Sequence, residues 1–176
     1  MATAKKTDRV RQEPPGGRLL DAFDRKILGA LAQSADISYA ELGRIVSLSA
    51  PAVHDRVKKL RASGCLLRTA ALLHGPAIGK PLLAFVHVDS GGWGKTRELM
   101  AVAELPEVEE VHSVAGDTSM LLKVRCASSR ALEALIDRIY ATPGVKSTRS
   151  YVVLSTYLER TTQADVSEFP ESAEPD

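Results

Sequence analysis

The spacing of apolar residues changes part-way along the chain, and this change restricts the folds that the chain can adopt. Between residues 20 and 62 apolar residues recur with the spacing of one helix face. Between residues 82 and 157, short apolar runs alternate with segments of helical spacing. A chain of 176 residues is long enough for two small hydrophobic cores. The pattern therefore predicts a helical first domain and a mixed second domain.

The first part is predicted to form three short helices. The first spans about residues 21–33 and has Asp21 as its N-cap. Its shared apolar face carries Leu20, Phe23, Ile27, Leu28 and Leu31. The second helix follows the capping-box pattern Ser38-Tyr39-Ala40-Glu41, in which serine and glutamate each satisfy a backbone donor of the other. It is expected to bury Leu42, Ile45 and Val46.

A third helix follows after very few residues. Ser47-Leu48 makes a tight turn, Ser49 is expected to cap the helix, and Pro51 lies in the first turn, where a missing N–H costs little. This helix runs to about Ala62 and ends at Ser63-Gly64. Short helices separated by such a turn predict a helix-turn-helix. The segment from Cys65 to Leu73 is β-like and is interpreted as a wing or a connecting strand.

The second part has the order βαββαβ. Strands are predicted over residues 82–88, 108–115, 120–126 and 145–157, and helices over residues 96–105 and 129–141. The later helix is expected to bury Leu132, Leu135, Ile136 and Ile139. Two β-α-β halves build a ferredoxin-like sandwich of the α+β class, in which helices cover one face of the sheet. In some of the strands, apolar residues occupy both alternating sets of positions and therefore both faces of the sheet. This predicts that the other face is also covered, most simply by another subunit.

These observations divide the chain into five segments. Residues 1–18 are predicted to be a flexible basic arm, and residues 19–67 a helix-turn-helix domain. Residues 68–80 are expected to be a linker strand, and residues 81–160 the ferredoxin-like domain. Residues 161–176 contain five acids and no base and are predicted to be a disordered acidic tail.

Charge is divided unequally between the two parts of the chain. Residues 1–68 hold 13 Lys and Arg against 7 Asp and Glu, whereas residues 69–176 hold 10 against 15. A basic half points to a polyanionic partner, although a solvated charged surface is the alternative.

On the third helix, Val53, Val57 and Leu60 gather on the buried side. The outward side of this helix supplies the candidate DNA contacts. A helix that follows a tight turn fits the major groove, where its first residues meet base edges and basic residues meet phosphates. Arg56 lies closer to the buried side, where pairing with a carboxylate would fix the fold instead. The predicted DNA-binding residues are Ser49, Pro51, His54, Lys58, Lys59 and Arg61.

Other classes of protein are disfavoured by the sequence. Cys65 and Cys126 are far apart and fit neither a disulfide framework nor a zinc finger. The four histidines are scattered, and no glycine-rich phosphate loop or nucleophile with a neighbouring base occurs, so we expect no catalytic residues and no cofactor. A metal site on His87 and His112 is disfavoured because no acids or cysteines cluster with them. No membrane span or secretory signal is found, and the expected location is cytoplasmic and nucleoid-associated.

Motifs in both halves resemble one family. Residues 20–28 (LDAFDRKIL), residues 37–42 (ISYAEL) and the pattern from Leu48-Ser49 to Gly64 resemble the DNA-binding domain of the leucine-responsive and asparagine-responsive transcription regulators, Lrp/AsnC. Residues 114–117 (VAGD), 121–124 (LLKV) and 143–153 (PGVKSTRSYVV) resemble the same family's effector and assembly domain. The resemblance covers about residues 19–158. It implies dimers that assemble further, binding to double-stranded DNA near promoters, and a small-molecule effector such as an amino acid.

The resemblance also suggests where an effector binds. Family members bind effectors around the loop at Gly116-Asp117, and a carboxylate there can neutralise an ammonium group. The implied effector-binding residues are Gly116, Asp117, Thr118, Ser119, Thr148, Ser150 and Tyr151. From the residues alone, the favoured interpretation of Gly116-Asp117 is a turn between two strands.

Two positions depart from the family pattern. Ser47 stands where the family often has glycine, at a cost of about 1 kcal/mol if φ is positive there. Thr118-Ser119-Met120 replaces an acidic residue and an aromatic residue after Gly116-Asp117. The leading hypothesis is a sequence-specific transcription regulator that responds to an amino acid or related molecule. The alternative is an effector-independent architectural DNA-binding protein.

Overall fold

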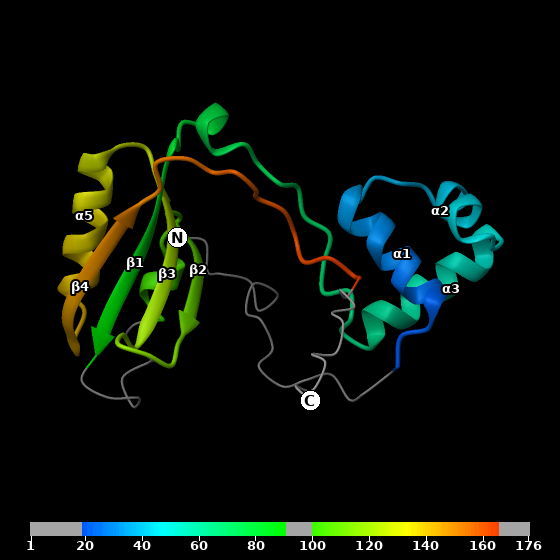
Figure 1. Cartoon of the computed structure of the whole chain (residues 1–176), viewed down its shortest axis with the longest axis horizontal. Helices are drawn as coiled ribbons and strands as arrows, with labels where there is room; N and C mark the ends of the chain where they lie inside the picture. The colour runs from blue at the N-terminus through cyan, green and yellow to red at the C-terminus, as the bar shows by residue number, and fades with distance from the viewer. Residues whose placement is uncertain (1–18, 91–99, 166–176) are drawn as a thin grey trace, which may run out of the picture. The chain divides into compact units, whose positions relative to one another are not determined.

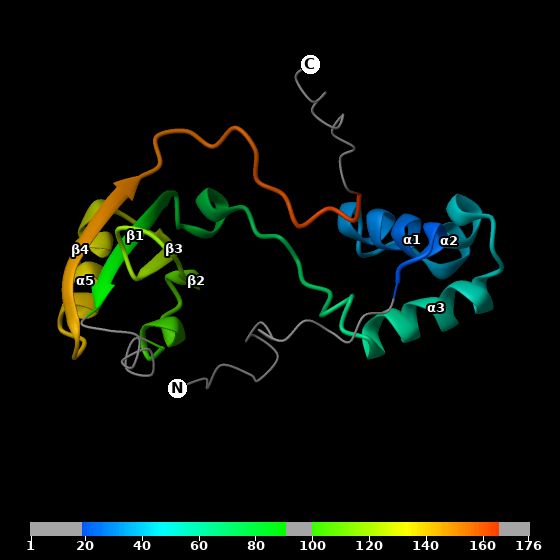
Figure 2. The same ribbon diagram turned by 60° about the horizontal axis from the view of Figure 1, so that its bottom comes forward.

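The chain forms two compact units. The computed structural model describes residues 19–90 and 100–165, so the predicted basic arm, residues 91–99 and residues 166–176 lie outside the description. Among the described residues, one unit contains residues 19–71 and 159–165, and the other contains residues 72–90 and 100–158. Figures 1 and 2 show helices in the first unit and a sheet with helices in the second.

The first unit contains three helices at the predicted places. They are α1 (Ala22–Gln33), α2 (Tyr39–Val46) and α3 (Ala50–Ala62). Asp21 is the N-cap of α1, and its carboxylate accepts a hydrogen bond of 2.7 Å from the Asp24 backbone N–H. The Ser38 hydroxyl and the Glu41 carboxylate form the reciprocal capping box of α2. Both N-terminal predictions are confirmed, because each side chain satisfies an amide that a helix start leaves without a partner.

The turn between α2 and α3 depends on two small residues. Ser47 has φ 57° and ψ 43°, the left-handed conformation that glycine adopts without strain. The Leu48 N–H donates to the Gly43 carbonyl at 2.9 Å. A Cβ atom on Gly43 would collide with the Leu48 carbonyl oxygen. The left-handed conformation of Ser47 costs about 1 kcal/mol. Glycine is required at position 43 because the Leu48 carbonyl lies too close to leave room for a Cβ atom.

The core of this unit comes from all three helices, with two differences from expectation. The fully packed side chains are Ile27, Leu42, Val46, Val53, Val57 and Leu60. Ile45 was expected in this core but is 55% exposed, because Gly43 takes the buried position beside the turn. Phe23 is also at the surface, 40% exposed, whereas Asp24 next to it is completely buried.

The expected strand after α3 is not formed. Residues 67–74 have no regular structure, and a 3-10 helix, η2 (Gly75–Ile78), follows. The β-like composition predicts a strand only if a partner strand pairs with it. Within the described ranges, the sheet pairs only the strands of the second unit. The interpretation of this segment as a wing or linker strand is therefore wrong for the single chain.

The second unit is a four-stranded sheet in the order β2-β3-β1-β4, with antiparallel pairing throughout. The strands are β1 (Leu82–Ser90), β2 (Val108–Ser113), β3 (Met120–Cys126) and β4 (Val145–Val152). This is the strand order of a ferredoxin-like fold, with the first and third strands in the centre. The last strand ends at Val152, five residues earlier than predicted.

One side of the sheet carries the hydrophobic core. Helix α5 (Ser129–Tyr140) buries Leu132, Leu135 and Ile139, whereas Ile136 is only partly buried. Of the helix predicted over residues 96–105, residues 96–99 lie outside the described residues. The described part, residues 100–105, forms no α-helix and contains only a short 3-10 helix, η4 (Val102–Glu104). From the strands, the core contains Ala84, Val86, Val88, Leu122 and Val124.

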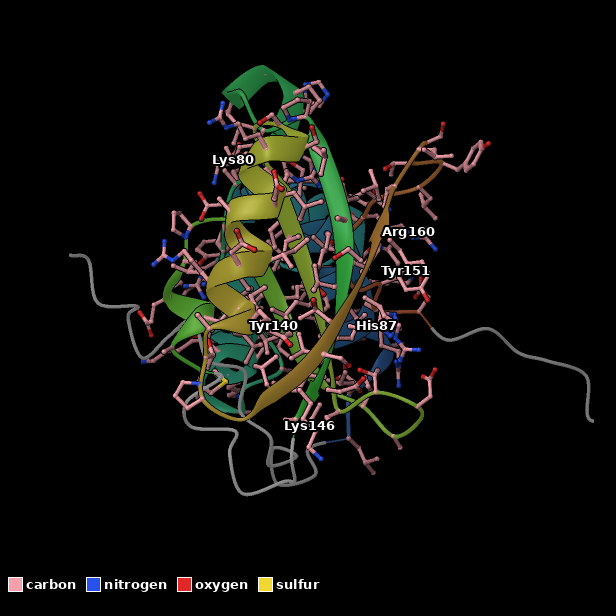
Figure 3. All side chains as sticks on the ribbon, turned by 90° about the vertical axis from the view of Figure 1, so that its left-hand side faces the viewer. Lys80, His87, Tyr140, Lys146, Tyr151 and Arg160 are labelled. Atoms are coloured by element: carbon pink, nitrogen blue, oxygen red, sulfur yellow. The ribbon has the colours of Figure 1, made fainter. Side chains whose placement is uncertain are left out.

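The opposite side of the sheet is open and carries a different set of side chains. Residues alternate between the two faces of a strand, so Phe85 and His87 lie on the face away from Val86. Figure 3 shows α5 on one side of the sheet and the labelled His87 and Tyr151 on the other. The rings of His87 and Tyr151 contact each other with centroids 5.0 Å apart. Tyr151 is 56% exposed, which leaves a partly apolar surface without cover in the single chain.

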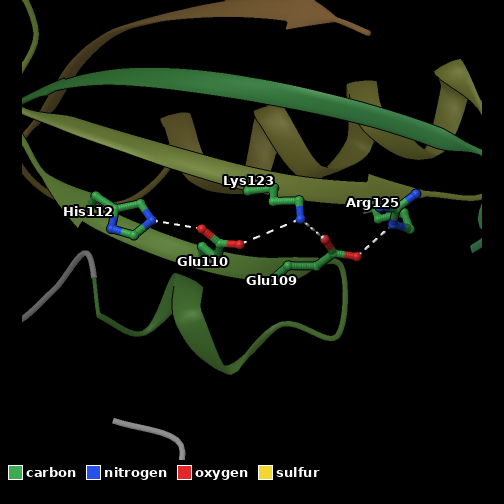
Figure 4. Close-up of polar contacts among 5 residues, drawn as sticks. All are labelled: Glu109, Glu110, His112, Lys123 and Arg125. Atoms are coloured by element: carbon green, nitrogen blue, oxygen red, sulfur yellow. Dashed lines mark hydrogen bonds and ion pairs between the residues drawn. The ribbon is translucent and has the colours of Figure 1, made fainter. Parts of the chain in front are cut away.

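A chain of ion pairs borders this open face along β2 and β3 (Figure 4). Glu109 contacts Lys123 at 3.4 Å and Arg125 at 2.7 Å, and Glu110 contacts Lys123 at 3.5 Å and His112 at 2.9 Å. The hydrogen bond from His112 is the largest cause that lowers the pKa of Glu110, followed among the lowering causes by the charge of Lys123. Charges of both signs therefore alternate along one edge of the open face.

Candidate functional site

The outward face of α3 carries the predicted DNA contacts as exposed side chains. Pro51, His54, Lys58, Lys59 and Arg61 are all exposed. Ser49 is the N-cap residue by backbone conformation, but its side chain makes no capping hydrogen bond. Its hydroxyl is therefore not used to start the helix. Lys59 and Arg61 lie in the last turn, where positive charge also favours the helix dipole.

His54 is oriented by a residue of α2. Its ring meets the ring of Tyr39 edge-on, with centroids 5.4 Å apart. Its Nδ1 lies 3.5 Å from the Asp55 carboxylate, and the His54 side chain is 55% exposed. Tyr39 was not singled out from the sequence as a functional residue. Its place at the start of α2 nevertheless positions His54 on the first half of α3.

Arg56 fixes α3 against α1. One guanidinium nitrogen, Nη1, lies 2.7 Å from Asp21 Oδ2 and 2.9 Å from Asp24 Oδ1. The Asp24 side chain is only 1% exposed, and the guanidinium carbon also lies 5.3 Å from the centroid of the Phe23 ring. Hydrogen bonds to both carboxylates raise the pKa of Arg56. The alternative in which Arg56 pairs with a carboxylate is therefore confirmed.

The loop between β2 and β3 lies at the end of the sheet where β4 begins and places Asp117 beside Arg149 of β4. Arg149 Nη1 lies 3.3 Å from Asp117 Oδ2, and Arg149 Nη2 donates to the Asp117 carbonyl at 3.2 Å. Both side chains are accessible, with 80% of Asp117 and 45% of Arg149 exposed. An exposed pair of this kind adds little stability, about 0 to 1 kcal/mol. Its charges remain accessible to a ligand.

A second carboxylate, Asp89, lies at the same end of the sheet. The Ser147 hydroxyl donates to Asp89 Oδ2 at 2.7 Å. This bond is the largest cause that lowers the pKa of Asp89, and the charge of Arg149 lowers it further. Arg149 therefore acts on two carboxylates that come from different parts of the chain.

The structure separates the residues that the family resemblance grouped around this loop. Thr118 is buried, and its hydroxyl lies within hydrogen-bond distance of the Val88 and Met120 carbonyls. The Ser119 hydroxyl accepts a hydrogen bond from the Ser90 N–H at 3.3 Å. Both side chains make these contacts within the single chain, and effector binding by Thr118 and Ser119 stays a prediction.

The β4 residues divide between the two faces of the sheet. Thr148 and Ser150 pair with Val88 and Val86, which face the core, whereas Tyr151 pairs with Phe85 on the open face. Of the seven residues implied by the resemblance, Gly116 and Asp117 stay exposed in the loop. Arg149, Asp89 and Ser147 were missed. Asp89 directly follows the predicted strand 82–88. Pairing this strand with the last predicted strand would have placed Asp89 near Ser147 and Arg149, so this pairing was the signal available in the sequence.

Comparisons with known proteins agree with this architecture. Residues 20–61 match the AsnC-type helix-turn-helix domain, and residues 83–163 match the Lrp/AsnC ligand binding domain. The chain is 34% identical over 143 residues to the HTH-type transcriptional regulator FL11 of Pyrococcus horikoshii, covering 81% of this chain and 94% of that protein. It is 36% identical over 142 residues to the leucine-responsive regulatory protein of Escherichia coli, covering 78% and 87%. The chain belongs to the Lrp/AsnC family.

Solved structures of Lrp/AsnC proteins have the same fold. A transcriptional regulator from Neisseria meningitidis in complex with L-methionine superimposes with a TM-score of 0.76 at 29% identity, covering 81% of this chain and 95% of that one. Escherichia coli AsnC gives a TM-score of 0.74 at 29% identity, covering 82% and 99%. The family consists of transcription regulators rather than enzymes.

The described part of this Lrp/AsnC chain contains neither a metal-binding cluster nor a membrane-spanning helix. Residues 19–90 and 100–165 contain no group of three or more His, Cys, Asp or Glu side chains that would hold a metal ion. None of the helices in these ranges has the length and apolar character that a membrane span requires.

Loss of the Arg56 cation is expected to destabilise the DNA-binding domain. In Arg56→Gln, the Asp24 carboxylate stays buried without its cation, and the expected loss is about 2 to 4 kcal/mol of unfolding free energy. Urea unfolding followed by circular dichroism measures this loss, and Lys26→Gln on exposed α1 surface is the matched control. Equal stabilities of the two variants would contradict the role of the ion pair.

The same contacts predict how stability depends on pH. The Asp24 backbone N–H, and then Arg56, lower the pKa of Asp21 below its ordinary value of 3.8. A lowered carboxyl pKa stabilises the fold above the unfolded-state value and loses this effect as the pH falls through the folded-state value. The stability difference between wild type and Arg56→Gln is therefore expected to shrink below about pH 3.8.

Proposed function

We propose that this regulator contacts DNA through the outward face of α3 and responds to an amino acid held near Asp117 and Arg149. The observation that carries the proposal is that the basic residues of α3 fall into two groups, one paired within the fold and one exposed. Arg56 is committed to the fold by Asp21 and Asp24, whereas the other basic residues of the helix face solvent. The fold is thus fixed by one cation and leaves the others for phosphates.

The position of each residue along α3 suggests its role. Ser49, Pro51 and His54 lie in the first part of the helix, which approaches base edges in a helix-turn-helix. Because its hydroxyl makes no capping bond, Ser49 can donate to a phosphate or a base. Lys58, Lys59 and Arg61 lie further along and are suited to phosphate contacts. His54 is held by Tyr39, which favours one orientation of its ring towards a base.

Lys58→Ala is expected to weaken DNA binding in a salt-dependent way. Each lost phosphate contact reduces the magnitude of the slope of log affinity against log salt by about 0.9. The measurement is fluorescence anisotropy with labelled duplex at several salt concentrations. Lys146→Ala, which removes an exposed lysine from β4, is the control and is expected to keep the wild-type slope. A wild-type slope for Lys58→Ala as well would remove Lys58 from the interface.

The cluster at the sheet end supports an effector with both charges. A free amino acid carries an ammonium and a carboxylate, and Asp117 and Arg149 offer the opposite charge to each. The Asp117–Arg149 pair is exposed and weak, so a ligand with both charges can replace it without leaving either group unpaired. The L-methionine complex of the Neisseria relative supports an amino acid as the class of effector.

Asp117→Asn is expected to reduce effector affinity by about 1.5 to 3 kcal/mol, because a charged hydrogen bond becomes a neutral one of similar shape. Calorimetric titration with a panel of amino acids measures this loss. Asp137→Asn, on the exposed side of α5, is the control. Equal affinities for wild type and Asp117→Asn would remove Asp117 from the site. A wild type that binds no member of the panel would favour an effector-independent architectural DNA-binding protein.

We also propose that the open face of the sheet is covered by a second copy of the chain. This face combines partly buried Phe85 and Leu121 with exposed Tyr151, and it is bordered by the ion pairs of β2 and β3. Beyond β4, the chain exposes Leu154, Tyr157 and Leu158. So many exposed apolar side chains are typical of a surface that assembles. A homodimer and further assembly are the proposed states.

Light scattering at micromolar concentration tests this assembly. The expected mass is at least twice the chain mass of 18.9 kDa. Placing a charge in the middle of the open face, by Phe85→Glu, is expected to lower the mass. A wild-type mass equal to that of one chain would show that the face is not an interface.

A further inference from the structure

The chain beyond β4 returns to the helices of the DNA-binding domain. Residues 159–165 group with that domain, and in both Figures 1 and 2 the orange-red end of the described chain lies beside α1. The Thr161 hydroxyl donates to the Ala32 carbonyl at 3.3 Å. Arg25 Nη1 donates to the Ala164 carbonyl at 3.1 Å. The sequence predicted a disordered tail from residue 161, yet these first residues contact α1 at two places.

The spacing of these contacts matches an extended segment along a helix. Arg25 and Ala32 are seven positions apart, which places them on the same face of α1 about 10.5 Å from each other along the axis. Thr161 and Ala164 are three positions apart, and three residues of extended chain span about 10 Å. The later residue of the segment contacts the earlier residue of the helix. The segment therefore runs antiparallel to α1, with its two contacts in register.

The contact at Ala32 meets a need of α1 itself. The last four carbonyls of an α-helix have no partner within the helix. α1 ends at Gln33, its C-cap residue Ser34 is extended, and its last turn has no basic residue. By contrast, α2 ends in left-handed Ser47, and Gly64 with φ 77° follows α3. Among the described helices of this domain, α1 alone has no left-handed residue after its C-terminal end, and the Thr161 hydroxyl supplies a donor there.

We propose that residues 159–165 form a C-terminal strap that is part of the DNA-binding domain and fastens it to β4. Two stretches of chain then join the two units, residues 63–81 and residues 153–158, instead of the first alone. The strap restricts the motion of α1, α2 and α3 relative to the sheet domain. The match to the ligand-binding domain ends at residue 163, so the Ala164 contact lies beyond it. This inference is independent of the proposed effector and of the DNA contacts.

Hydrogen exchange of the full chain tests whether the strap is docked. Thr161→Val keeps the shape of the side chain and removes the hydroxyl donor. Thr162→Val is the matched control, since Thr162 is its exposed neighbour. We expect the amides in the last turn of α1 to exchange about threefold faster in Thr161→Val and at the wild-type rate in Thr162→Val. Equal exchange in the two variants would overturn the docking.

Two truncations test whether the strap fastens the domain. One chain stops after Leu158 and lacks the strap, and the other stops after Asp165 and keeps it while losing the remaining acids. Nitrogen-15 relaxation gives a rotational correlation time for each domain. We expect the helices to tumble measurably faster relative to the sheet only in the chain that stops at Leu158. If the ratio of the correlation times of the two domains is the same in both truncations as in the full chain, the fastening role is overturned. Faster tumbling of the helices in both truncations would assign the fastening to residues 166–176 instead.

Discussion

The ion pair between Arg56 and buried Asp24 is the interaction on which the DNA-binding domain depends most. The Asp24 side chain is only 1% exposed, and a buried carboxylate that loses its cation destabilises the fold. That cation comes from α3, so the same contact that neutralises Asp24 also sets how α3 lies on α1. Asp21 caps α1 and accepts from the same guanidinium, which joins helix capping to helix packing. The outward face of α3 follows from this arrangement.

The sheet domain is governed by a different constraint, because its described helices cover only one face. The buried face is aliphatic and is packed by α5. The open face mixes aromatic rings with a border of ion pairs. At one end of the same sheet, Arg149 holds Asp117 and acts on Asp89. An effector that binds at this end would therefore meet residues from three segments that only the sheet brings together.

The sequence predicted the elements well and the site only in part, for physical reasons. Local signals such as the Asp21 cap and the Ser38-Glu41 capping box depend on residues a few positions apart, so they were visible in the sequence. The Arg149–Asp117 contact joins residues 32 positions apart and depends on strand register. The Thr118 hydroxyl contacts the Val88 carbonyl, which lies 30 positions earlier in the sequence and comes close only when β1 pairs with β3. The segment 65–73 has the composition of a strand but lacks a partner strand among the described residues.

The central claim is that the first half of α3 selects the DNA sequence whereas its later lysines add affinity without selecting. Selection of bound duplexes from a random pool, with the bound molecules sequenced, tests it most directly. The account predicts that wild type enriches one motif, that His54→Ala changes the preference at one position of it, and that Lys58→Ala enriches the same motif with weaker binding. An unchanged motif from His54→Ala, with the change caused instead by Lys58→Ala, would contradict the account.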